Sequence, residues 1–177
     1  SGNKAPEVID SERTITITAY SDRANLPEED RQKLDAAYNA VVNTEDLSTL
    51  NSGLKDLATQ AGADSKDLAV SDLFDISTSD NTDGTFSIEL KPETLNNFVC
   101  LLHYHNDAWT IVEGAQTTDE GTLRFTVSDL SPFAIVVNTR AGATGDPIGI
   151  LLPVFAILMV VSAVGIVIVW RKSKKSA

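Results

Sequence analysis

Alternating runs of apolar and polar residues recur along the chain and predict β-strands. A period of two places successive side chains on opposite faces of a strand. The run Thr-Ile-Thr-Ile-Thr-Ala-Tyr at 14–20 is typical, because it also consists largely of β-branched residues. The same criteria predict six further strands, at 68–77, 86–90, 98–104, 109–112, 123–127 and 133–137.

Between the first two predicted strands the spacing of apolar residues becomes helical. A first helix is expected from Pro27, since proline is accepted in the first helical turn, and it should end at Asn43. A second helical stretch covers 46–60, as one helix or as two short ones divided near Gly53, and Gly62 is a candidate C-cap. The apolar face of the first helix has the spacing of an amphipathic helix and comprises Leu34, Ala37, Tyr38, Val41 and Val42.

Two sequences typical of turns lie between predicted strands. Asp83-Gly84 lies between the runs 68–77 and 86–90 and predicts a β-hairpin there. Asn106-Asp107 predicts a turn between the strands 98–104 and 109–112.

These elements predict an α+β fold. Seven short strands and one helical excursion near the N-terminus favour a small β-sandwich-like sheet covered on one side by helices. We expect residues 1–12 to be a linker and residues 13–139 to form one extracellular domain, which is long enough for a single core.

A long uncharged segment near the C-terminus predicts one transmembrane helix. Residues 148–170 include no charged side chain, and as a helix they would be about 34 Å long, against about 30 Å of bilayer hydrocarbon. Trp170 would lie at the interface. The basic tail 171–177 should be cytoplasmic, which places the N-terminus outside; a tail-anchored topology would instead move four cations across the bilayer. Those cations are Arg171, Lys172, Lys174 and Lys175.

The net charge of the chain limits the partners that it is expected to bind. The chain carries a net charge of −11, and because the tail contributes four positive charges, residues 1–170 carry −15. Nucleic acid is therefore not an expected partner.

The chain begins Ser-Gly-Asn-Lys, without an initiator Met or a signal peptide. We expect a mature form or the C-terminal part of a longer precursor with upstream domains.

Candidate catalytic and metal-binding residues are few. Cys100 lies in an apolar run and is expected to be a small buried residue rather than a nucleophile. His103 and His105 are spaced to share one face of a strand, but no further zinc ligands accompany them. Cys100 and His103 should point to opposite faces. The sequence thus predicts no enzyme activity, no cofactor and no metal.

The second half of the chain resembles a known bacterial family. The stretches Leu102-His-Tyr-His-Asn-Asp-Ala-Trp and Ser131-Pro-Phe-Ala-Ile-Val136, followed by an apolar segment and a basic tail, resemble the membrane-proximal C-terminal domain of Gram-positive surface proteins. The resemblance extends from about Thr14 to the C-terminus and is strongest after Phe98. It implies a non-catalytic stalk beneath larger binding modules.

The resemblance also implies a sorting signal, which here is degenerate. Such signals read Leu-Pro-x-Thr-Gly, whereas residues 141–145 read Ala-Gly-Ala-Thr-Gly. Thr144 and Gly145 keep the candidate sortase cleavage pair, but the Leu-Pro pair is missing. Residues 140–147 are therefore expected to be a flexible linker, cleaved by a sortase and joined to peptidoglycan, or left intact.

The favoured function is a membrane-proximal segment that tethers a single-pass bacterial surface protein to the cell membrane or the cell wall. One alternative is a receptor-like or adhesin module whose acidic extracellular domain binds a ligand. The other is the anchor portion of a larger surface enzyme. The upstream domains, the ligand and the oligomeric state cannot be read from the sequence.

Overall fold

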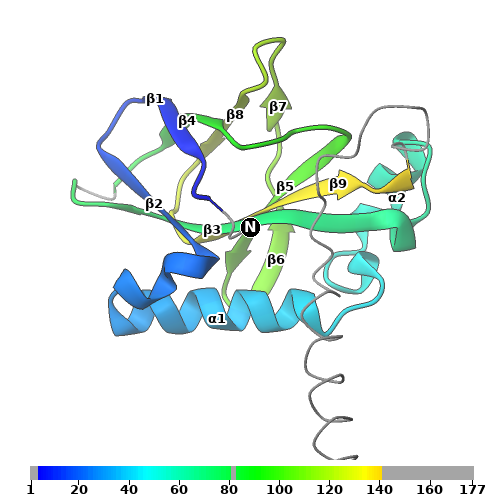
Figure 1. The fold of residues 1–177 in the computed structure, drawn as a ribbon, viewed down its shortest axis with the longest axis horizontal. Coiled ribbons are helices and arrows are strands. Elements are labelled where there is room, and N and C mark those ends of the chain that lie inside the picture. The colour runs from blue at the N-terminus through cyan, green and yellow to red at the C-terminus, as the bar shows by residue number, and fades with distance from the viewer. Residues whose placement is uncertain (1–3, 81–82, 141–177) are drawn as a thin grey trace, which may run out of the picture.

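The computed structural model describes residues 4–80 and 83–140, which form two antiparallel β-sheets and a few helices (Figure 1). The four-stranded sheet has the order β1 (Glu7–Ser11), β4 (Phe86–Lys91), β8 (Leu123–Val127) and β7 (Gln116–Thr117). The five-stranded sheet has the order β2 (Ile15–Ala19), β3 (Leu68–Thr78), β9 (Pro132–Asn138), β5 (Phe98–His105) and β6 (Ala108–Ile111). The prediction that β-structure is combined with a few helices near the N-terminus is confirmed.

The helices lie between β2 and β3 in the sequence. The two α-helices are α1 (Glu28–Val42) and α2 (Gly53–Gln60), and the 3₁₀ turns are η1 (Tyr20–Asn25), η2 (Leu47–Thr49) and η3 (Ser65–Asp67). The second predicted helical stretch is thus two short pieces, which separate just before Gly53. Gly62 has a φ of +70° and follows the C-cap of α2, as its sequence position predicted.

Two apolar cores lie on opposite faces of the five-stranded sheet. One fills the space between the two sheets and includes Phe74, Phe86 and Phe133. The other lies between the five-stranded sheet and the helices, with Leu34 and Leu54 fully buried. Figure 1 shows α1 across one face of this sheet and the four-stranded sheet over the other. The five-stranded sheet is therefore the middle layer.

Strand β9 contributes to both cores. It pairs with β3 on one side and with β5 on the other, and each of its seven residues is buried. Phe133 and Ile135 face the four-stranded sheet, whereas Ala134 and Val136 face the helices. A strand that is covered on both faces needs apolar residues at successive positions, which explains the unbroken run Phe-Ala-Ile-Val-Val.

Two features differ from the sequence-based expectation. Residues 7–11, expected within a linker, form β1 at the edge of the four-stranded sheet, with a bulge between Val8 and Asp10. The expected hairpin at Asp83-Gly84 is wrong. Both edges of β3 are already paired, with β2 and β9, so the chain crosses to the other sheet and β4 pairs with β1 and β8. The turn at Asn106-Asp107 is confirmed, and both residues have positive φ values.

The predicted membrane segment, 148–170, lies outside the described residues, as do the linker from 141 and the basic tail. Within the described part of the chain, no helix is long and apolar enough to cross a membrane.

Candidate functional site

The anchor residues predicted from the sequence are not placed by the structure. Thr144 and Gly145 lie beyond the last described residue, Arg140, and so does Trp170. The same holds for the tail cations Arg171, Lys172, Lys174 and Lys175. The structure does describe the strand and the two residues that lead towards them.

The chain leaves β9 through a compact set of hydrogen bonds, which we name the exit clamp (Asp67, Asn138, Thr139 and Arg140). The main-chain oxygen of Asp67 accepts from the Thr139 amide at 2.8 Å and from its hydroxyl at 2.7 Å. The Asp67 carboxylate binds Arg140 Nη1 at 3.2 Å. Asn138, only 4% exposed, donates from Nδ2 to the Ala61 carbonyl at 3.2 Å and accepts from the Arg140 amide at 2.9 Å. The clamp fixes the end of β9 to η3 and to the end of α2.

We predict that Asn138→Ala lowers the free energy of unfolding by about 1–3 kcal/mol. The substitution leaves the Ala61 carbonyl and the Arg140 amide without their side-chain partner near a buried position. Urea denaturation measures the loss. Asn39→Ala, at an exposed position on α1, is the control and should change the free energy by less than about 0.5 kcal/mol. Equal values for the two variants would contradict a structural role for the clamp.

The two histidines lie on one face of β5, as their spacing predicted. The His103 and His105 rings stack with centroids 5.9 Å apart. His103 Nε2 lies 2.6 Å from the Ser131 hydroxyl, which also donates to the Tyr104 carbonyl at 2.5 Å. His105 Nδ1 lies 2.5 Å from the Asp129 carboxylate.

This arrangement does not activate Ser131 as a nucleophile. Its proton is directed to a carbonyl, so the histidine nitrogen acts as the donor to the hydroxyl oxygen. The carboxylate contacts the other histidine, so no Ser-His-Asp relay is formed. Burial lowers the pKa of His103, which keeps the ring neutral near pH 7.

Cys100 is buried against the helical layer, as expected from its apolar context. Burial raises the pKa of the Cys100 thiol to about 12, so the reactive thiolate is scarce at neutral pH. His103 stacks on Phe133 on the other face of the sheet, which confirms that Cys100 and His103 point apart.

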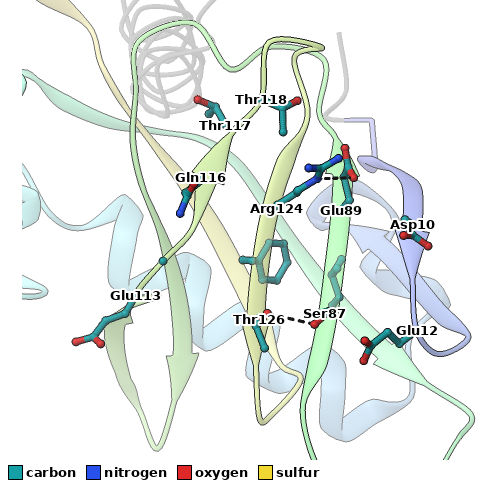
Figure 2. Close-up of a pocket in the computed structure, with 13 residues that line it drawn as sticks. Asp10, Glu12, Ser87, Glu89, Glu113, Gln116, Thr117, Thr118, Arg124 and Thr126 are labelled. Carbon is teal, nitrogen blue, oxygen red and sulfur yellow. Dashed lines mark hydrogen bonds and ion pairs between the residues drawn. The ribbon is translucent and has the colours of Figure 1, made fainter.

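A polar hollow of about 520 Å³ lies on the outer face of the four-stranded sheet (Figure 2). Cross-strand pairing aligns four of its side chains: Asp10 is opposite Glu89, Glu89 is opposite Arg124, and Arg124 is opposite Gln116. We call these four residues the polar row. Figure 2 shows them on β1, β4, β8 and β7. Ser87 and Thr126 form a second cross-strand pair beside the polar row, with their hydroxyl oxygens 3.3 Å apart.

The centre of the polar row is rigidly held. Glu89 is only 8% exposed, and its two oxygens accept from the Thr122 hydroxyl at 2.5 Å and from Arg124 Nε at 2.7 Å. The hydrogen bond from Arg124, followed by that from Thr122, lowers the pKa of Glu89, so the carboxylate is ionised near neutral pH. The guanidinium itself is largely exposed, and its Nη1 and Nη2 atoms have no partner among the described residues.

Sequence reasoning did not identify the polar row. Its members are up to 114 positions apart in the chain, from Asp10 to Arg124, and only the strand register brings them together. The one available signal was the outward-facing polar residue at every second position of the strands 86–90 and 123–127. That pattern is also what any solvated sheet face shows.

Among residues 4–80 and 83–140, no group of three or more His, Cys, Asp or Glu side chains is arranged to hold a metal ion. No protein-family model, curated protein or solved structure matches the chain significantly.

Proposed function

We propose that the chain is a non-catalytic, membrane-proximal segment that tethers a bacterial surface protein to the membrane or the cell wall. In this proposal residues 4–140 lie outside the cell, residues 148–170 span the bilayer, and the tail 171–177 is cytoplasmic. The observation that carries the proposal is the position of β9: the strand leading to the apolar segment is the most protected strand of the fold.

A tether must resist force applied along the chain, and β9 suits that task. Its backbone is paired with β3 and with β5, and in antiparallel sheets these hydrogen bonds run perpendicular to the strands. Force applied at Arg140 along the strand therefore loads many hydrogen bonds together. An edge strand, which is paired on one side only, would share the same force among fewer hydrogen bonds. The exit clamp adds three contacts to Asp67 where the force would enter.

The membrane part of the proposal rests on sequence. Residues 148–170 lack charge, and four cations follow them at once, the arrangement of a helix whose C-terminal end is cytoplasmic. The bilayer is thus the first proposed partner. A sortase and peptidoglycan are conditional partners, because Thr144-Gly145 retains the scissile pair while the Leu-Pro pair is absent.

The second candidate function is a binding module, and the polar row favours it. A rigid, hollowed arrangement of donors and acceptors exceeds what a spacer needs. The two functions are compatible in one chain, since the row lies on the four-stranded sheet and the exit clamp lies at the end of β9, which belongs to the five-stranded sheet.

Protease treatment of intact protoplasts tests the proposed topology. We predict that added protease, at concentrations that digest the folded domain, removes residues before 148 and leaves a small membrane-protected fragment. A cytoplasmic marker protein should stay intact in the same sample, as the control for sealed membranes. Protection of the whole domain until the protoplasts are lysed would contradict the outside placement.

A further inference from the structure

The hollow over the polar row has the donors and acceptors of a ligand-binding groove, and we propose that it binds a neutral carbohydrate chain lying across the four strands. This binding activity goes beyond tethering. It is argued from the charge of the groove, the fixed geometry of its centre and the spacing of its side chains.

Charge limits the ligand first. The hollow is lined by one guanidinium, that of Arg124, and by four carboxylates, those of Asp10, Glu12, Glu89 and Glu113. An anion attracted to Arg124 would meet the four carboxylates at the same time. A cation would be attracted to Asp10, Glu12 and Glu113 around the hollow, but at its centre it would meet Arg124. The ion pair between Arg124 and Glu89 makes the centre of the polar row close to neutral, which suits a neutral ligand lying over it.

Hydrogen bonding then selects among neutral ligands. Arg124 offers two terminal nitrogens that only donate, and Asp10 offers oxygens that only accept. Gln116, Ser87 and Thr126 can do both. A ligand that fits this mixture must itself donate and accept at neighbouring atoms. Vicinal hydroxyl groups do so, and their spacing suits planar guanidinium, carboxylate and amide groups.

The geometry repeats at a regular distance. Neighbouring strands lie roughly 4.8 Å apart, so the four members of the polar row span roughly 14 Å in three equal steps. One step is about the width of a sugar ring. A linear oligosaccharide placed across the strands would therefore meet one polar group per ring over two to three rings.

The centre of the groove is preorganised for such a ligand. Arg124 is held through Nε by Glu89, and Glu89 is held by Thr122, so the guanidinium plane is oriented before binding. Little side-chain entropy is then lost when the ligand binds. Ile88 and Phe125 also line the hollow, but both are buried in the core between the sheets, so the hollow offers no exposed apolar anchor of the kind that protein partners usually need. This favours a glycan over a peptide.

Calorimetry on the full chain tests the proposal. The chain is kept in a detergent without a sugar head group and titrated with neutral linear hexasaccharides from cellulose, chitin, xylan and amylose. Pentalysine and a sulfated oligosaccharide serve as charged comparisons. We expect at least one neutral hexasaccharide to bind, with hydrogen exchange slowed in 86–91 and 116–127.

Matched variants assign the binding to the groove. Arg124→Lys keeps the charge but loses the two-pronged donor, and should weaken binding about tenfold or more, as for loss of a charged hydrogen bond. Gln116→Ala, at an exposed position that poses no risk to folding, should weaken it less. Arg31→Lys, which alters an exposed ion pair on α1, should leave affinity unchanged.

Three outcomes would overturn the proposal. The first is that no neutral hexasaccharide binds at millimolar concentration. The second is that only pentalysine or the sulfated oligosaccharide binds, which would make the groove an electrostatic site. The third is binding that Arg124→Lys and Gln116→Ala leave unchanged, which would place the ligand elsewhere.

Discussion

Replacing Phe133 with alanine should lower the free energy of unfolding by about 3–5 kcal/mol, the usual range for a buried aromatic residue. Phe133 is fully buried and joins rings from three other strands. Its ring centroid lies 4.6 Å from that of His103, 5.6 Å from Phe125 and 6.3 Å from Phe74. The cavity would therefore open in the contact between the two sheets, directly on β9.

Chemical denaturation measures this loss. The midpoint concentration of denaturant should fall, while the slope of the unfolding free energy against denaturant concentration should stay the same as in the parent. The control is Ile9→Ala, because Ile9 is 46% exposed on the edge strand β1 and should cost less than about 1 kcal/mol. A loss below 1 kcal/mol for Phe133→Ala would mean that β9 is not the strand that secures the two sheets.

Replacing Asp75 with asparagine should have the opposite effect and stabilise the protein at neutral pH. Asp75 is 3% exposed on the α1 side of β3, and its Oδ2 atom has no hydrogen-bond partner among the described residues. Burial, reinforced by the negative charge of Asp30 and opposed by Lys33, raises the pKa of Asp75 to about 6. Lys33 gives little relief because its ammonium group is 2.8 Å from Glu29.

The raised pKa of Asp75 determines how the stability of the protein depends on pH. Because the folded state binds the Asp75 proton more tightly than the unfolded state, the contribution to stability is fully present below about pH 4. It is lost as the pH rises through about 6. At pH 8 the ionised carboxylate should cost about 2–3 kcal/mol, which Asp75→Asn removes.

The measurement is the difference in unfolding free energy between Asp75→Asn and the parent, at pH 5 and at pH 8. Taking a difference cancels the other carboxylates, including Glu89, whose pKa is lowered and whose contribution runs the other way. We expect a clear gain at pH 8 and about half of that gain at pH 5, where the unfolded carboxyl is already ionised and the folded one is mostly protonated. Asp119→Asn, in an exposed turn, is the control. A gain that is the same at both pH values would show that the pKa of Asp75 in the folded protein is not raised above its value in the unfolded chain.

Local structure could be predicted where the sequence pattern was regular. The strands at 14–20, 86–90 and 123–127 alternate with period two, and the amphipathic spacing around Leu34 marked α1. Strand β1 was missed because a bulge between Val8 and Asp10 interrupts the alternation. In β9 the run of apolar residues predicted a strand, and its burial on both faces shows why alternation is absent.

Pairing between strands could not be predicted in the same way. Asp83-Gly84 has the composition of a hairpin turn, yet the strands on either side belong to different sheets, because β2 and β9 occupy both edges of β3. The polar row was out of reach for the same reason, since the register of four strands defines it. The exit clamp depends on Asp67, which is 71 residues before Asn138 in the sequence. Residue pattern therefore indicates elements, and long-range pairing decides the sites.

Cell fractionation tests the proposed anchoring most directly. The parent chain and a variant that ends after Pro147 are expressed with the same secretion signal in a Gram-positive, sortase-bearing host. We predict that detergent extracts the parent from membranes with its C-terminal residues intact by mass spectrometry, while the truncated variant is released into the medium. Changing Ala141-Gly142 to Leu-Pro should transfer the protein to the fraction released by wall hydrolase, ending at Thr144. Recovery of the intact parent chain in the medium, in the same amount as the truncated variant, would contradict the tether.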